Sequence, residues 1–292
     1  MKVMKFGGTS VGSPQRMQDV SQLITKSGEP TFVVLSAMSG TTNSLIEVCD
    51  YLYKKNSDGA NEVINTLEKK YMKHVDELYS TQEMKETTRK FLADEFRYLR
   101  SFTKDIFTSF EERIIVAQGE VISTNMVVNY LKEIGIKALL IDALDFMRTD
   151  KNAEPDAPYI KEHLSEIMSA NKGYQIYITQ GFICRNAYGE VDNLQRGGSD
   201  YTASLIGAAL MADEIIIWTD IDGMHNNDPR IVDKTEAVHQ LHFEEAAELA
   251  YFGAKILHPT CVQPAKFTGI PVRIKNTMDP EADGTVINNT LK

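Results

Sequence analysis

The chain has 292 residues, of which 42% are apolar and 25% are charged. This composition is typical of a globular protein of about two domains or lobes, and it excludes bulk disorder. The formal net charge of −10 argues against a nucleic-acid binder, because such proteins need a basic face to neutralise phosphates.

Short apolar, β-branched runs alternate along the chain with longer amphipathic stretches. This order predicts an α/β fold with an open, mostly parallel central sheet sandwiched by helices, whose strands all end at one edge. The expected strands are Met1–Phe6, Thr31–Ser36, Ile136–Ile141, Tyr174–Thr179, Glu214–Thr219 and Pro271–Lys275. The expected helices are Pro14–Lys26, Thr42–Lys54, Ser109–Glu133, Tyr159–Asn171 and Tyr201–Ala212.

One region departs from this alternation. Residues 57–104 carry many charges, few β-branched runs and no convincing strand, which predicts a helical insertion packed against the sheet domain. No long Pro/Gly/Ser linker marks a hinge between separate domains.

The turn after the first expected strand is rich in glycine. The strand ends in KFGGTSVG, and Ser13 and Pro14 then suit the start of a helix. Such a turn presents backbone N–H groups to an anion, but no GK[ST] follows, so the Walker A interpretation fails. Lys5 instead precedes the glycines on the strand. It either faces an anion or extends to solvent from the edge of the sheet.

A second turn, Ser36–Asn43, places small residues and several hydroxyl groups before the next expected helix. It suits an anion or a carboxylate, although simple N-capping is favoured by this segment alone. Glu120 lies inside a long expected helix, and its local pattern indicates a surface residue.

The loop before the fifth expected helix is more informative. Arg196 can hold a carboxylate with two parallel hydrogen bonds. Gly197 and Gly198 allow close approach of a ligand to the backbone, and Ser199 is expected to cap the helix. Asp200 either contributes to a site or only complements the helix dipole.

Acidic and basic residues follow the fifth expected strand. Asp220 and Asp222 suit Mg²⁺ or a ribose, although Asp-Gly is also an ordinary turn pair. Arg230 and Lys255 are available as phosphate ligands. Together, the loops at this edge suit phosphoryl transfer, in which a protein mainly positions two substrates and neutralises charge.

The remaining metal-ligating residue types carry little signal. Cys49, Cys184 and Cys261 are far apart and form no CxxC pair, so we expect neither a disulfide framework nor a cysteine zinc site. His239 and His242 fit the entry of a helix as well as they fit a metal site. No signal peptide and no long apolar segment is evident, so we expect a cytoplasmic protein without a membrane partner.

Two long motifs carry a family resemblance. Residues 5–11, KFGGTSV, and residues 196–203, RGGSDYTA, look like those of aspartokinases, in the amino-acid kinase superfamily. Further matches are SAMSGTTN at 36–43, Gly119-Glu120, QGF at 180–182, WTD at 218–220, DPR at 228–230 and FGAKILHP at 252–259. The resemblance implies one amino-acid kinase domain over residues 1–276, with a nucleotide lobe over about 213–276 and a C-terminal tail over 277–292.

The resemblance also implies the reaction, which is ATP-dependent phosphorylation of the L-aspartate side chain on the route to lysine, threonine and methionine. Lys5 would bridge the transferring phosphoryl group, and Asp200 would orient the lysines. The implied catalytic residues are Lys5, Asp200 and Lys255. The implied aspartate-binding residues are Ser36, Thr42, Glu120, Arg196 and Ser199, with Glu120 at the ammonium group and Arg196 at the α-carboxylate. The implied nucleotide-binding residues are Lys5, Gly7, Gly8, Ser10, Thr219, Asp220, His225, Arg230, Lys255 and Ile256. Mg²⁺ would be held largely by the phosphates and water rather than by a protein metal site, and a homodimer is the expected assembly.

Two departures from the family pattern matter. His225 stands where aspartokinases commonly have a tyrosine near the nucleotide. The ACT-type regulatory domains common in the family are not expected in this chain, so neither is feedback inhibition through them. The alternatives are a kinase for another small carboxylate with the same fold and a nucleotide-binding protein without activity.

Overall fold

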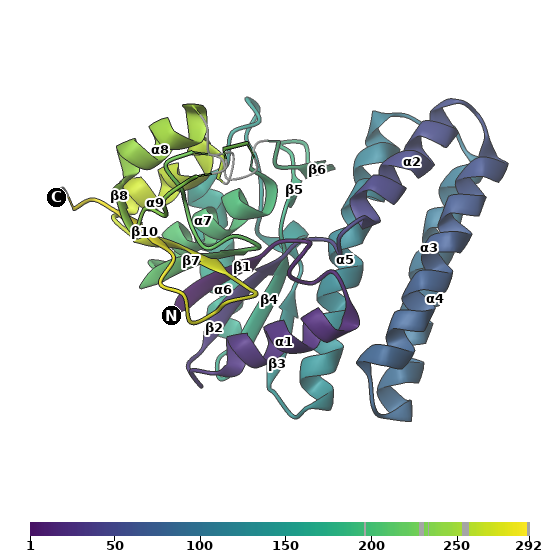
Figure 1. Ribbon diagram of the computed structural model, residues 1–292. Coiled ribbons are helices and arrows are strands. Elements are labelled where there is room, and N and C mark those ends of the chain that lie inside the picture. Colours follow the sequence, from purple (N-terminus) through teal and green to yellow (C-terminus); the bar gives the residue numbers. More distant parts are fainter. Residues whose placement is uncertain (196, 228–230, 233, 253–256, 291–292) are drawn as a thin grey trace.

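The computed structural model describes residues 1–195, 197–227, 231–232, 234–252 and 257–290. Within these ranges, eight strands form the main sheet in the order β3-β4-β2-β1-β7-β9-β10-β8 (Figure 1). Their bounds are β1 Lys2–Phe6, β2 Thr31–Leu35, β3 Ala138–Ile141, β4 Ile176–Gln180, β7 Glu214–Thr219, β8 Gln240–His242, β9 Val272–Asn276 and β10 Thr285–Asn288. A separate antiparallel pair consists of β5 (Ile183–Arg185) and β6 (Val191–Asn193).

The sheet is mostly parallel, as predicted. Six neighbouring strands of the sheet, in the order β3-β4-β2-β1-β7-β9, pair in parallel. Each of the six expected strands overlaps one of them. β10 runs antiparallel to β9 and parallel to β8. The segment expected to be a C-terminal tail therefore contains a strand of the main sheet, which is only four residues long.

Helices cover both faces of the sheet. The five expected helices are α1 Pro14–Thr25, α2 Thr41–Tyr53, α5 Ser109–Glu133, α6 Ala157–Ala170 and α7 Gly198–Leu210. The others are α3 Ser57–Leu78, α4 Gln82–Ser101, α8 Phe243–Phe252 and α9 Gln263–Thr268, with 3-10 turns η1 Phe102–Lys104, η2 Ala143–Asp145 and η3 Pro259–Val262. α1 and α5 pack in the core on one face, and α6, α7 and α9 pack in the core on the other. No helix of the described ranges is long and apolar enough to cross a membrane.

β1 lies inside the sheet, between β2 and β7. Its side chains alternate, so that Met4 and Phe6 belong to the core beneath α1 and α5 and Val3 belongs to the core beneath α7. Lys5 is on the same side of β1 as Val3 and pairs in register with Val34 and Ile217. Because Lys5 lies on an interior strand and only 13% of its side chain is exposed, the alternative that it extends to solvent is wrong.

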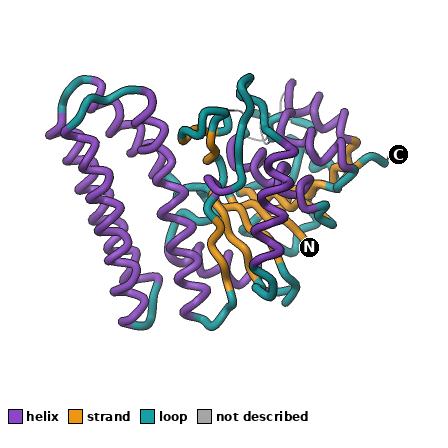
Figure 2. The backbone as a smooth tube through the Cα atoms, turned by 180° about the vertical axis from the view of Figure 1, so that it is seen from behind, coloured by secondary structure: helices purple, strands orange, loops and turns teal. Residues whose placement is uncertain are grey.

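Residues 57–104 form the helical hairpin α3–α4, followed by η1. The hairpin stands at one side of the molecule and packs against α2 and α5 rather than on the sheet (Figures 1 and 2). Apolar residues at helical spacing bury one stripe of α3, while its charged residues face outward. The buried residues of α3 are Ala60, Ile64, Leu67, Tyr71, Val75 and Leu78.

Candidate active site

Loops from several strands meet at the carboxyl edge of the sheet, beside the start of α7. They enclose a cavity of about 290 Å³. Its lining residues are Gly8, Ser36, Ala37, Met38, Ser39, Gly40, Thr42, Glu120, Phe182, Gly198 and Ser199. Four of the residues expected to bind aspartate, namely Ser36, Thr42, Glu120 and Ser199, thus line one cavity. This is the place where open α/β sheets bind ligands.

Lys5 and Asp200 form an ion pair next to this cavity. The Lys5 Nζ atom lies 2.8 Å from Asp200 Oδ1, and the two side chains are only 13% and 15% exposed. A lysine on an interior strand needs such a partner, because an unpaired ammonium group is costly to remove from water. A Cβ atom on Gly7 would lie 3.4 Å from Nζ, so the glycine-rich turn runs directly past the charge.

The turns after β1 and β2 are clamped together. A Cβ atom on Gly8 would lie 2.8 Å from the carbonyl oxygen of Ala37, which leaves room for glycine alone. The Ser39 amide donates to the Gly8 carbonyl at 3.1 Å, and the Ser36 amide donates to the Phe6 carbonyl at 3.1 Å. The backbone of these two turns therefore forms one rigid floor at the strand ends.

The start of α7 contacts the end of β2 through two serines. Ser36 Oγ donates a hydrogen bond to Ser199 Oγ at 2.9 Å. The expectation that Ser199 caps this helix is wrong, because Gly197 occupies the N-cap position with φ of 81°. Only glycine adopts this left-handed conformation freely, and a Cβ atom there would lie 1.8 Å from Cys261 Sγ. The earlier start of the helix turns Ser199 into the cavity.

Gly181 has no side chain, which allows the start of α7 to approach it closely. A substitution at Gly181 tests whether the site depends on this approach. Its missing Cβ atom would lie 2.3 Å from Ser199 Oγ. We expect Gly181→Ala to displace Ser199 and Asp200, to lower stability by about 1–3 kcal/mol and to raise KM for the bound substrate at least about tenfold.

Gly207→Ala is the matched control. In that variant the Cβ atom would lie 2.4 Å from Ile215 Cδ1, where α7 packs on β7 and away from the cavity. Steady-state kinetics and thermal unfolding of both variants separate the effects. An unchanged KM in Gly181→Ala would show that the site does not depend on this close approach.

Glu120 is a buried acid, although its local pattern indicates a surface residue. It is 5% exposed, and burial raises its pKa to about 8 against partial compensation by backbone hydrogen bonds from Glu120 and Ala37. Gly119 permits this packing, since its Cβ atom would lie 2.7 Å from the Cβ atom of Ala37. Among the described residues, Glu120 Oε2 finds no hydrogen-bond partner. The cavity thus offers a carboxylate that a cationic group of a ligand can complete.

The expected nucleotide side begins at the end of β7. Thr219 Oγ1 donates to Asp220 Oδ1 at 3.2 Å, and the Thr277 amide donates to the Thr219 carbonyl at 2.8 Å. The hydroxyl groups of Ser10 and Thr277 lie 2.6 Å apart. Ser10 is therefore buried and tied to Thr219 through Thr277, which fixes the first turn against the end of β7.

His225 is held by hydrogen bonds from both ring nitrogens. Nε2 lies 2.7 Å from Asp222 Oδ1, and Nδ1 lies 2.9 Å from Thr235 Oγ1. The bond to His225 lowers the pKa of Asp222. Asp222 is thus engaged by His225, while Asp220 is exposed beyond the strand end. The expected site residues Arg196, Arg230, Lys255 and Ile256 lie outside the described residues.

The three cysteines and the histidine pair lie within the described part of the chain. Cys49, Cys184 and Cys261 are all described and buried, and no disulfide joins them. The described ranges contain no group of three or more His, Cys, Asp or Glu side chains that could hold a metal ion. The His242 amide donates to Glu245 Oε2 at 2.7 Å where α8 begins, as at an ordinary helix entry.

Comparison with known proteins places this geometry in context. A family model described as "Amino acid kinase family" matches residues 1–276. Aspartokinase 1, chloroplastic, of Arabidopsis thaliana is 37% identical over 306 residues, which cover 99% of this chain and 52% of that protein. Lysine-sensitive aspartokinase 3 of Escherichia coli (strain K12) is 34% identical over 292 residues, which cover 98% of this chain and 64% of that protein.

A solved structure shares the fold. The crystal structure of E. coli aspartokinase III in complex with aspartate and ADP matches with a TM-score of 0.88 and 32% identity, covering 100% of this chain and 65% of that one. The chain spans 52% to 65% of the length of these relatives. The family match covers the helical hairpin, the residues that line the cavity and the main sheet except β10. The chain therefore belongs to the amino acid kinase family.

Proposed function

We propose that this chain transfers the γ-phosphoryl group of ATP to the side-chain carboxylate of L-aspartate, giving 4-phospho-L-aspartate. The observation that carries the proposal is the buried, incompletely paired carboxylate of Glu120 in the cavity that adjoins the Lys5–Asp200 pair. The cavity matches an amino-acid substrate, and the adjoining lysine matches a phosphoryl group. The similar E. coli structure holds aspartate and ADP, which supports the same pair of ligands here.

The cavity residues take the parts that their chemistry suits. Glu120 pairs with the substrate ammonium group, and the hydroxyl groups of Ser36, Thr42 and Ser199 hold the amino acid by hydrogen bonds. Arg196 binds the α-carboxylate in the bidentate manner that guanidinium groups favour. The side-chain carboxylate is then directed toward Lys5.

The phosphates lie along the Gly7–Gly8 turn, with Lys5 at the transferring group and Thr219, Asp220, His225, Arg230, Lys255 and Ile256 around the nucleotide. A carboxylate oxygen of aspartate attacks the γ-phosphorus in line, the bond to the oxygen that bridges the β- and γ-phosphorus breaks, and ADP leaves with those electrons. Lys5 compensates the charge on the γ-phosphoryl oxygens during transfer. No covalent enzyme intermediate is needed.

Mg²⁺ supplies further charge compensation when it is bound with ATP. This ion keeps several waters and binds nucleotide phosphates with one or two carboxylates. Asp200 beside Lys5 and the exposed Asp220 are carboxylates at this edge that fit the role.

We also propose a homodimer as the assembly, which sedimentation of the purified chain would test.

The decisive test is turnover of ATP with Mg²⁺, with and without L-aspartate, in which the acyl phosphate is trapped as its hydroxamate. We expect hydroxamate that depends on aspartate. Hydroxamate with other small carboxylates but not with aspartate would favour a kinase of different specificity. ATP binding without turnover would favour a nucleotide-binding protein and contradict the proposal.

A further inference from the structure

Tyr71 connects the helical hairpin to the edge of the cavity that holds Glu120 and Ser199, where we propose that aspartate binds. It lies on α3 and is fully buried, and its hydroxyl oxygen lies 2.6 Å from Thr41 Oγ1. Thr41 is also fully buried and begins α2. Its neighbours in sequence, Gly40 and Thr42, both line the cavity. A side chain of the hairpin therefore bonds the turn that forms one wall of the site.

Thr41 is held from its other side by α5. A Cβ atom on Gly119 would lie 3.4 Å from Thr41 Cγ2, so the methyl group of Thr41 packs against the backbone just before Glu120. The Gly40–Thr42 turn is thus held between Tyr71 and α5, the helix that carries Glu120. Any shift of Thr41 changes the distance between this turn and Glu120.

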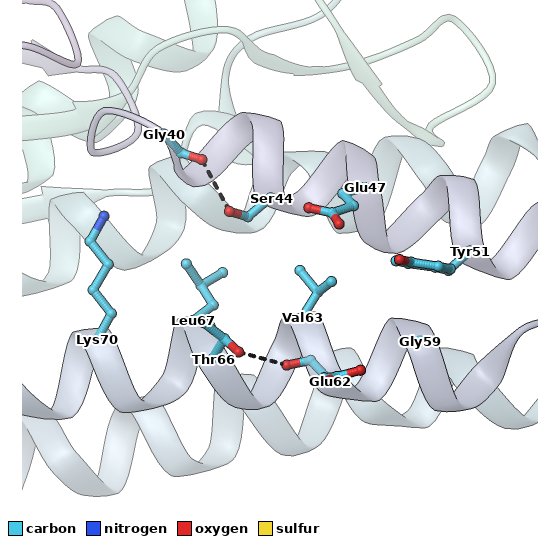
Figure 3. A pocket seen from close by; sticks show the side chains of 10 residues that line it. All are labelled: Gly40, Ser44, Glu47, Tyr51, Gly59, Glu62, Val63, Thr66, Leu67 and Lys70. Carbon is cyan, nitrogen blue, oxygen red and sulfur yellow. Dashed lines mark hydrogen bonds between the residues drawn. The ribbon is translucent and has the colours of Figure 1, made fainter.

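Residues of α2 and α3 also line a groove of about 430 Å³ (Figure 3). Gly40 and Lys70, the neighbours in sequence of Thr41 and Tyr71, lie at one end of it, and Tyr51 and Gly59 lie at the other. Beside this groove the two helices pack against each other, because Leu45, Val48 and Ile64 belong to one buried core. At the end nearest the cavity, the buried Tyr71–Thr41 bond adds a polar contact to this apolar packing.

We propose that Tyr71 is a positioning residue for aspartate, whose hydroxyl group holds the Gly40–Thr42 turn at its distance from Glu120. This inference rests on the proposed function. Removing the hydroxyl group leaves Thr41 Oγ1 without its partner in a position that excludes water. We expect Tyr71→Phe to raise KM for aspartate about fivefold to tenfold. Because Tyr71 lies on the aspartate side, kcat and KM for ATP should stay within about twofold.

Tyr79→Phe is a matched control. Tyr79 follows α3 and is also buried, and its hydroxyl group donates to the Met126 carbonyl at 2.6 Å, away from the cavity. The variant loses a comparable buried hydrogen bond, so we expect a comparable drop in melting temperature with no change in KM for aspartate. This separates positioning from a general loss of stability.

Thr41→Val removes the same bond from the other partner. We expect this variant to show the same rise in KM as Tyr71→Phe, and the double variant to be no worse than either single one. Thr41→Val also carries the test if Tyr71→Phe fails to fold. An unchanged KM for aspartate in an active Tyr71→Phe enzyme would overturn the positioning role and leave the proposed function intact. A wild-type chain with no aspartate-dependent turnover would overturn both.

Discussion

Lys5→Ala is expected to lower kcat by about 10²- to 10³-fold, which corresponds to about 3–4 kcal/mol of transition-state stabilisation. The ammonium group lies at the carboxyl end of the central strand and is paired with Asp200, so it is fixed where charge develops on the transferring phosphoryl group. Its loss removes that charge compensation and leaves Asp200 as an unpaired, mostly buried carboxylate. Single-turnover kinetics with ATP and aspartate measure the effect directly.

Lys2→Ala is the control, since Lys2 is also a lysine of β1 but pairs with Glu214 on the strand's other side, with 44% of its side chain exposed. It should change kcat by less than about twofold. A near-normal kcat in Lys5→Ala would remove the catalytic role given to this lysine. It would also leave the ion pair with a purely structural purpose.

Glu120→Gln is expected to raise KM for aspartate by about 10²-fold, because the ionised carboxylate is the partner of the substrate ammonium group in a water-excluded site. The pH dependence gives a second signature. Burial raises the pKa of Glu120 to about 8, so the fraction of enzyme able to bind the ammonium group grows as the pH approaches that value. As the pH rises toward 8, KM for aspartate of the wild-type enzyme should fall by up to about tenfold for each pH unit. KM for aspartate of the variant should stay constant over the same range.

The same raised pKa affects stability with a definite sign. The folded protein keeps the Glu120 proton up to about pH 8, whereas the unfolded chain loses it near its ordinary value of 4.5. The native state thus binds more protons in this window, and stability falls as the pH rises through it. Thermal unfolding should show Glu120→Gln gaining on the wild type between pH 5 and pH 8.5, since the neutral amide avoids the cost of a buried charge.

Glu95→Gln separates these two effects. Glu95 is a carboxyl group of α4 whose pKa is also raised by burial and whose Oε2 finds no hydrogen-bond partner among the described residues. The variant should share the pH-dependent gain in stability but leave KM for aspartate unchanged. Equal kinetic defects in Glu95→Gln and Glu120→Gln would contradict a specific role for Glu120 in binding.

Most of the architecture could be predicted from the sequence because its signals are local. Apolar runs of four to six residues specify β2, β3, β4 and β7, and helical periodicity with side-chain N-caps specifies α1, α3 and α4. The expected bounds of α5 match the structure, where Thr108 and Glu111 form a capping box. β8, β5 and β6 have three residues each, too few to establish an alternating pattern.

The candidate site also has features that the local sequence indicates and features that it does not. Its chemistry was present in the sequence, as glycines that admit anions, a lysine on a strand, and an Arg-Gly-Gly-Ser-Asp segment before a helix. The family resemblance implied the roles that we propose for these residues. The resemblance also implied a binding role for Glu120, but the local sequence pattern gave no sign that this residue is buried.

Only the tertiary structure decided how these groups meet. Lys5 and Asp200, Ser36 and Ser199, and Tyr71 and Thr41 are distant in sequence, and each pair forms because different loops and helices pack at one edge of the sheet. The pKa of Glu120 likewise depends on how much water the surrounding segments exclude, which no local pattern contains. The sequence by itself determined which chemical groups are available and which elements carry them. Long-range packing decided which of them are paired, buried or left open to a substrate, because burial and pairing are properties of neighbours that the chain brings together only on folding.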